Sequence, residues 1–160
     1  MATVTRLNHA VLFVRDPDAS AAFYREAFGF EEVAREFEGQ AIFMRSPAAD
    51  NHHDLGLFSV GATAPHPPRG STGLYHLAWQ VGTIDELAEM KETLSRLGAL
   101  TGASDHGVSK SLYGKDPDGI EFEIMFAVPR NDWGDDEKRG VIRTLDLQRE
   151  VAKYGTSRRA

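Results

Sequence analysis

The sequence predicts an α+β protein built from two similar βαβββ modules, and three observations support this prediction. The segments LNHAVLFV (7–14) and LYHLAWQV (74–81) share the pattern Leu-x-His-x-x-x-x-Val at an offset of 67. A helical pattern follows each of these segments, and further strand-like segments follow each helix. A repeat of this kind is typical of a chain assembled from equivalent structural units.

The helix of each module is expected from apolar residues at helical spacing, over 18–28 and over 84–97. Gly29 and Gly98 follow these helices, at the position where a left-handed C-cap is favoured. The apolar positions are Ala22, Phe23, Ala27 and Phe28 in the first helix, and Leu87, Met90, Leu94 and Leu97 in the second.

The later strands also match between the modules. AIFMRSP (41–47) resembles SLYGKDP (111–117) at an offset of 70, and HDLGLF (53–58) aligns with EFEIMF (121–126) at an offset of 68. We interpret the change in offset, from 70 to 68, as a loop that is two residues longer in the first module. In the second module this connection is the tight turn Asp-Pro-Asp-Gly (116–119), where proline and glycine suit the backbone angles of a turn.

The expected organisation is one domain over 1–128, followed by a tail over 129–160. The domain holds the two modules, at about 7–60 and 74–128, and a proline- and glycine-rich linker over 61–73. An open sheet must bury its apolar face, so we expect the modules to pair, in one chain or across a dimer, around a curved cavity.

The tail is expected to contain a short helix that packs on the body of the protein or on a partner. Its apolar side would comprise Val141, Leu145, Leu147 and Val151.

The composition excludes several classes of function. The formal charge is −6, from 18 basic and 24 acidic residues, which argues against nucleic-acid or anionic-membrane binding. Because there is no cysteine, disulfides, thiolate nucleophiles, iron–sulfur clusters and cysteine-bound zinc are excluded. No apolar run is long enough to span a membrane, and the N-terminus lacks the apolar core of a signal peptide. We therefore expect a cytoplasmic protein that acts on a small molecule.

Two histidines and one carboxylate stand out as metal ligands. His9 and His76 occupy the same position in the two modules, and Glu123 alternates with apolar residues on its strand. A carboxylate in such surroundings is costly to bury unless it is paired or binds a metal. Two imidazoles and one carboxylate suit non-heme Fe(II), with Mn(II) as a substitute and zinc left open. The alternatives are hydrogen-bonded core histidines and an exposed carboxylate.

These motifs resemble the vicinal oxygen chelate superfamily, which includes glyoxalase I, fosfomycin-resistance proteins and type I extradiol dioxygenases. The resemblance covers about 7–128. It implies paired βαβββ modules that form a curved mixed sheet, a half-open barrel around a metal site. It also places the metal ligands on His9, His76 and Glu123.

Three further positions resemble the extradiol ring-cleaving branch, through the motifs HHDLGLF and HGVSKSLYGKDPDGIEFE. The resemblance implies that His53 is an acid/base near dioxygen, that His106 hydrogen-bonds the substrate and that Tyr113 is an active-site tyrosine. The spacing from His106 to Tyr113 is two residues shorter than in the two-domain enzymes. The resemblance is to the single-domain members, so we expect no separate N-terminal domain of the kind that the two-domain enzymes have.

Strand alternation offers a separate interpretation of the first module. It places His53 on the face of Leu55 and Leu57, which the repeat equates with the face of Glu123, and it turns His52 outward. Simple structural roles are the alternative for His53, His106 and Tyr113: a surface residue, a loop residue and a sheet aromatic.

The repeat also equates Leu55 with Glu123. Glyoxalase-type members of the superfamily have a fourth metal ligand in this region, usually an acidic residue. Leucine cannot bind a metal, so the resemblance implies a three-ligand site with one metal per chain and open positions for a substrate.

The expected function is therefore Fe(II)-dependent extradiol cleavage of a catechol-like aromatic diol by O2, in a homodimer without nucleic-acid or membrane partners. The alternatives are a glyoxalase-like lyase or isomerase, or a thiol transferase, on the same metal platform. A non-catalytic binder of small molecules such as antibiotics is a further alternative.

Overall fold

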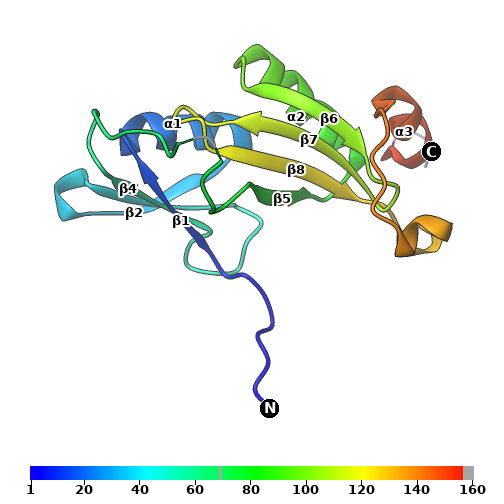
Figure 1. Cartoon of the computed structure of the whole chain (residues 1–160), viewed down its shortest axis with the longest axis horizontal. Helices are drawn as coiled ribbons and strands as arrows, with labels where there is room; N and C mark the ends of the chain where they lie inside the picture. Colours follow the sequence, from blue (N-terminus) through cyan, green and yellow to red (C-terminus); the bar gives the residue numbers. More distant parts are fainter. Residues whose placement is uncertain (69, 157–160) are drawn as a thin grey trace. The chain divides into compact units, whose positions relative to one another are not determined.

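The computed structural model describes residues 1–68 and 70–156 and divides into two compact units, Met1–Ser71 (unit 1) and Thr72–Ala160 (unit 2). Each unit has one four-stranded mixed sheet with a helix against it (Figure 1). The α+β class and the βαβββ order of each module are confirmed. Neither sheet closes into a barrel. The boundary between the units falls inside the predicted linker, and the pairing of the modules around a metal stays a prediction.

The two sheets have the same topology. In each, the first strand runs parallel to the fourth, and the other neighbours are antiparallel. The strand orders are β1-β4-β3-β2 and β5-β8-β7-β6. Unit 1 comprises β1 (Ala10–Val14), α1 (Pro17–Phe28), β2 (Glu31–Glu36), η1 (Phe37–Gly39), β3 (Ala41–Arg45) and β4 (Leu55–Ser59). Unit 2 comprises β5 (Leu77–Val81), α2 (Ile84–Arg96), β6 (Leu100–Asp105), β7 (Ser109–Lys115), β8 (Glu121–Ala127), η2 (Arg130–Asp132), η3 (Gly134–Lys138) and α3 (Leu147–Tyr154).

Local sequence signals explain where the helices begin and end. Asp16 caps α1 by accepting a hydrogen bond from the Ala19 amide, and Gly29 ends the helix with φ of 70°. A capping box between Thr83 and Glu86 starts α2. Gly98, with φ of 67°, follows this helix in the left-handed region that glycine adopts most easily.

The strand register corrects one prediction. Val11 pairs with Gly56 in unit 1, and its counterpart Ala78 pairs with Glu123 in unit 2. The residue equivalent to Glu123 is therefore Gly56, and the prediction of Leu55 was wrong. The loop between β3 and β4 is three residues longer than its counterpart, not two. An alternating apolar segment fits either alignment, and pairing with the neighbouring strands fixes the register. Glycine has no ligating side chain either, so the expectation that this position supplies no ligand still holds.

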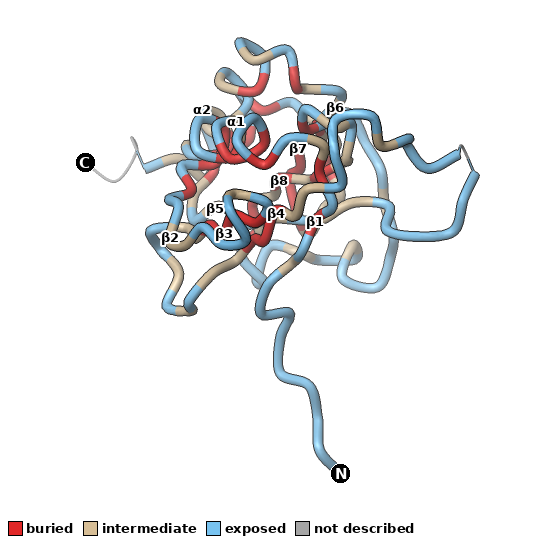
Figure 2. The backbone as a smooth tube through the Cα atoms, turned by 90° about the vertical axis from the view of Figure 1, so that its left-hand side faces the viewer, coloured by how far each residue is buried: buried red, intermediate tan, exposed pale blue. Residues whose placement is uncertain are grey.

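The core of each unit lies between its helix and one face of its sheet. Figure 2 shows buried residues on the helices and strands and an exposed N-terminal segment. Fully buried side chains in unit 1 include Val14, Tyr24, Ile42, Met44, Leu55 and Leu57, and those in unit 2 include Ile84, Leu87, Leu94, Leu112, Phe122 and Ile124.

One pair of neighbouring core positions is filled differently in the two units. Met44 lies opposite Leu55 in unit 1, and the equivalent pair in unit 2 is Gly114 and Phe122. The Phe122 ring occupies the space that a Cβ at position 114 would need, and the carbonyl oxygen of Ala99 would be 2.9 Å from that Cβ. A large and a small residue in unit 2 thus replace two medium-sized ones.

The tail belongs to unit 2, where α3 packs on α2. Asp146 caps α3, Leu147 is buried, and Val141 and Leu145 precede the helix. Glu150 is buried beside Lys110, which also contacts the buried carboxylate of Asp105. Residues 157–160 of the predicted tail lie outside the described residues. Among the described residues, no helix combines the length and apolar character needed to cross a bilayer.

Candidate functional site

Unit 2 brings His76 and Glu123 together. His76 lies directly before β5, and Glu123 lies on the neighbouring parallel strand β8. The Nε2 atom of His76 is 3.0 Å from Oε2 of Glu123, and both side chains are largely buried, with 24% and 13% of their surface exposed. This distance suits an ion pair or hydrogen bond.

The same distance also fits two ligands of one metal ion. Two ligand atoms at right angles, each about 2.1 Å from an octahedral ion, are about 3.0 Å apart. Imidazole nitrogen and carboxylate oxygen are donors that Fe(II) and Mn(II) accept. Nδ1 of His76 is buried without a hydrogen-bond partner among the described residues. The ring is instead flanked by Tyr75 and Tyr113, at 4.8 and 5.9 Å between ring centroids.

Tyr113 and His106 extend this cluster. Tyr113 lies opposite Glu123 in the β7–β8 register, and its hydroxyl is 2.7 Å from Nε2 of His106. Nδ1 of His106 is 2.8 Å from the carbonyl oxygen of Val141. Burial raises the pKa of Tyr113, and the negative charge of Glu123 raises it further, so the phenol stays protonated at neutral pH. Unit 2 thus gathers four of the six predicted site residues.

Unit 1 brings the other two together. His9 lies directly before β1, and its ring centroid is 4.5 Å from that of His53. The side-chain oxygen of Asn8 is 3.0 Å from Nδ1 of His9, which leaves Nε2 of His9 available as a ligand. The pKa of His53 is lowered, first by partial burial and then by the neighbouring His9 and His52. His53 is therefore mostly neutral at neutral pH, as a proton acceptor needs to be.

The strand-alternation argument for His53 was wrong. Leu55 and Leu57 are fully buried in the core of unit 1, whereas His53 precedes β4 and contacts Phe43 at a centroid distance of 5.0 Å. Phe43 pairs with Gly56, so His53 lies on the sheet face opposite that of Leu55 and Leu57. Alternation does not apply to a residue outside the strand.

Two residues around His53 were not assigned a supporting role from the sequence. The side-chain Nδ2 of Asn51 donates to the backbone carbonyls of Asn8 and His53 at 2.9 and 2.7 Å, which ties the loop to the segment that carries His9. His52 is exposed, as expected, but its Nδ1 lies 3.0 Å from Nδ1 of His53. The loop sequence Asp-Asn-His-His is rich in polar residues, and this was the sequence feature that could have indicated supporting residues next to His53.

Neither unit by itself holds a group of three His, Asp or Glu side chains that could bind a metal, over the residues described. A centre formed by His9, His76 and Glu123 needs ligands from both units. It therefore stays a proposal.

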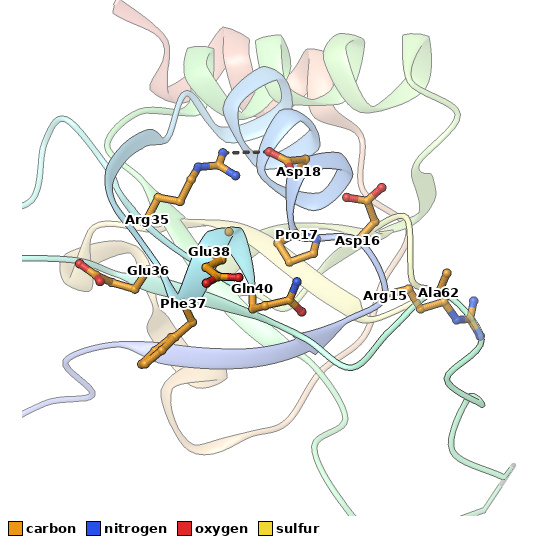
Figure 3. Close-up of a pocket in the computed structure, with 11 residues that line it drawn as sticks. Arg15, Asp16, Pro17, Asp18, Arg35, Glu36, Phe37, Glu38, Gln40 and Ala62 are labelled. Atoms are coloured by element: carbon orange, nitrogen blue, oxygen red, sulfur yellow. Dashed lines mark ion pairs between the residues drawn. The ribbon is translucent and has the colours of Figure 1, made fainter.

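A surface hollow of about 660 Å³ in unit 1 lies apart from the predicted site residues, none of which lines it. It is bounded by the start of α1 and by the turn at η1, and Figure 3 shows its lining side chains. Arg35 is paired with Asp18 at 2.8 Å and with Glu32 at 3.0 Å, so its charge is already matched. The hollow therefore supports no role in the predicted site.

Comparison with curated proteins finds several dioxygenases. The chain is 30% identical over 159 residues to the catechol-2,3-dioxygenase of Bacillus subtilis (strain 168), covering 97% of this chain and 54% of that protein. It is 26% identical over 133 residues to the manganese-dependent 2,3-dihydroxybiphenyl 1,2-dioxygenase of Geobacillus genomosp. 3, covering 81% and 39%. It is 30% identical over 134 residues to the biphenyl-2,3-diol 1,2-dioxygenase 3 of Rhodococcus globerulus, covering 81% and 68%. The chain thus spans about half of the length of the first relative and less than half of the length of the second.

Solved structures with the same fold include proteins with other activities. A glyoxylase/bleomycin resistance protein/dioxygenase domain from Frankia sp. EAN1pec matches with a TM-score of 0.66 and 24% identity, covering 80% of this chain and 96% of that chain. The lactoylglutathione lyase of Agrobacterium tumefaciens matches with a TM-score of 0.58 and 26% identity, covering 78% and 96%.

A family model supplies the assignment. The model of the glyoxalase/bleomycin resistance protein/dioxygenase superfamily matches residues 6–124, which include the two equivalent histidines, the carboxylate and the tyrosine described above. The chain therefore belongs to the glyoxalase/bleomycin resistance protein/dioxygenase superfamily.

Proposed function

We propose that this protein is a metal-dependent extradiol dioxygenase that cleaves the ring of a catechol-like aromatic diol with O2. The observation that carries the proposal is the cluster in unit 2, where the pair His76–Glu123 lies beside the pair Tyr113–His106. The names of the curated relatives support a diol substrate and dioxygenase chemistry.

His76 and Glu123, together with His9 from unit 1, would hold one divalent ion. Fe(II) is our first choice, and the manganese-dependent relative supports Mn(II) as the alternative. When bound, the ion supplies Lewis acidity that makes two vicinal hydroxyls easier to deprotonate. Gly56 is the counterpart of Glu123 in unit 1 and has no side chain to bind a metal. At the positions equivalent to His76 and Glu123, unit 1 would therefore supply one ligand, His9.

The other side chains would orient the diol and move protons. The Tyr113 hydroxyl would hydrogen-bond one substrate oxygen and hold it next to His76 and Glu123. His53 would accept a proton at Nε2 and return it later, since its Nδ1 faces His52. Ring cleavage incorporates both oxygen atoms of O2 into a ring-opened semialdehyde acid, so the overall reaction balances without an external reductant.

The test is anaerobic loading of the protein with Fe(II) or Mn(II), followed by a panel of catechols and then air. We expect a yellow ring-opened product and consumption of one O2 for each diol, recorded by absorbance and by an oxygen electrode. No yellow product with either metal across the panel would contradict the proposal.

The likeness to the Agrobacterium lyase structure favours one second candidate, a metal-dependent lyase or isomerase. Such an enzyme would turn over its substrate without oxygen. Turnover of a hemithioacetal under strict anaerobiosis, with no oxygen uptake in air, would establish it in place of the dioxygenase.

Two further expectations remain part of the proposal. We expect a homodimer, which light scattering on the purified protein measures directly. We also expect a cytoplasmic location, which fractionation of cells tests.

A further inference from the structure

The C-terminal tail contacts the loop that carries His106. The family model ends at residue 124, so the tail, from 129 onward, lies outside the region that the superfamily match covers. It contacts the predicted site through the Val141 carbonyl oxygen, which lies 2.8 Å from Nδ1 of His106. This contact has a chemical consequence for Tyr113.

The contact determines where the proton of a neutral His106 resides. A carbonyl oxygen can only accept a hydrogen bond, so Nδ1 of His106 must carry the hydrogen in the 2.8 Å contact with Val141. A neutral imidazole has one ring proton, which leaves Nε2 without a hydrogen. In the 2.7 Å contact with Nε2, the Tyr113 hydroxyl must therefore be the donor.

Several contacts hold the tail in place against this loop. The backbones of Asp105 and Arg143 exchange two hydrogen bonds of 2.9 Å. The Arg143 guanidinium binds the Asp136 carboxylate through two bonds of 2.7 and 2.8 Å. Asp136 lies against Gly107, where a Cβ would overlap its carboxylate. The loop and the tail thus fit each other closely at the residue directly after His106.

We propose that the tail sets the tautomer of His106 and thereby makes the Tyr113 oxygen a hydrogen-bond acceptor toward the substrate. With its own hydrogen committed to His106, Tyr113 has only oxygen lone pairs to offer a diol hydroxyl. In the opposite tautomer, Tyr113 would donate to the substrate instead. The statement about the substrate rests on the proposed function, whereas the statement about the tautomer does not.

This assignment changes the role expected for His106. Both of its ring nitrogens are engaged, one by Val141 and one by Tyr113. His106 is therefore a positioning residue that acts through Tyr113, in place of the direct substrate contact that the resemblance implied.

The test is nitrogen NMR of the histidine rings in the full chain, with the His106 signals identified by their loss in H106Q. We expect Nδ1 to show the shift of a protonated nitrogen and Nε2 that of an unprotonated one. A wild-type spectrum with the proton on Nε2 would overturn the inference. The measurement needs no substrate, so absence of ring cleavage would count against the proposed function alone.

Variants of the tail test the cause. R143Q removes the ion pair with Asp136, and D136N removes the same pair from the other side if R143Q folds poorly. We expect the ratio of the two His106 tautomers to shift by about fivefold, the equivalent of one weakened hydrogen bond. Faster exchange of the Asp105 amide should accompany the shift.

The matched control is E137Q, which removes another exposed ion pair in the tail, that of Glu137 with Arg130 at 2.6 Å. We expect this variant to leave the tautomer ratio unchanged. An unchanged ratio in both R143Q and D136N, or an equal shift in E137Q, would show that the tail does not set the tautomer.

Discussion

The two units share one topology but differ in what their equivalent positions carry. In each sheet, three positions lie together on the face away from the core: the residue before the first strand, one on the third and one on the fourth. Unit 2 fills them with His76, Tyr113 and Glu123, and unit 1 with His9, Phe43 and Gly56.

The comparison teaches that the repeated fold supplies positions, while each sequence decides which of them carry chemistry. Among these three positions of unit 1, only the one held by His9 carries a side chain that can bind a metal. An aromatic ring and a residue without a side chain take the other two places, next to His53. Under the proposed function, unit 2 would hold the polar part of the site, and unit 1 would supply one ligand, an acid/base and an apolar wall.

The largest effect is expected from E123Q. This change removes the carboxylate of unit 2 at the position where unit 1 has Gly56. Loss of a charged ligand should weaken metal binding by at least about 100-fold and abolish turnover. Metal content after dialysis measures the first effect directly.

The control for this variant is E121Q, on the same strand, where Glu121 pairs with Lys115 at 3.2 Å and is more exposed. It should retain metal and activity. Equal metal loss in both variants would mean that Glu123 is not a ligand.

H53Q tests the contribution of unit 1 to proton transfer. Removal of a general acid/base should lower kcat by about 10²- to 10⁴-fold while the bound metal is retained. Steady-state kinetics and metal analysis separate the two effects. H66Q, a change at an exposed histidine of the linker, serves as the control. Loss of metal in H53Q would make His53 a ligand.

Y113F makes unit 2 resemble unit 1, where Phe43 takes the equivalent place. Loss of the oxygen that accepts a hydrogen bond from a diol hydroxyl should lower kcat/KM by about 10-fold. The matched change Y154F, at a tyrosine of the tail, should have no such effect. Unchanged kinetics in Y113F would show that the Tyr113 hydroxyl does not contact the substrate.

G114A tests the difference in core filling and should have the smallest effect. A methyl group at this position must displace the Phe122 ring or the backbone at Ala99, which should cost about 1–3 kcal/mol in the free energy of unfolding. G102A is the control, because the nearest atom to its Cβ would be 3.9 Å away. Equal denaturation midpoints for the two variants would contradict the packing argument.

Much of the fold follows from the sequence because the same local signals occur twice. The two module helices, the short tail helix and all six segments used to detect the repeat overlap elements of the structure. The β-bulges could not be predicted, although they occur at equivalent places, between Glu32 and Ala34 and between Leu100 and Gly102. A bulge depends on how two strands pair, which neither strand encodes alone.

The site was less predictable, for two physical reasons. Register is fixed by hydrogen bonds between distant strands, so the alignment of the two repeats misassigned Leu55 as the counterpart of Glu123. The tautomer of His106 depends on the carbonyl group of Val141, and a backbone carbonyl carries no sequence signal. Side-chain types could be recognised from the sequence, but not the main-chain groups that orient them.

The complementary core pairs also bear on how the protein could be recombined. Because the Phe122 ring leaves no room for a side chain at Gly114, and Met44 faces Leu55, a chimera that moves β7 into unit 1 would leave a void beside Leu55. Moving β3 into unit 2 would instead place methionine where the Phe122 ring already lies. The smallest segment that can be exchanged between the repeats is therefore the antiparallel pair, β3 with β4 or β7 with β8. Any shuffling or duplication of this fold would have to preserve these pairs.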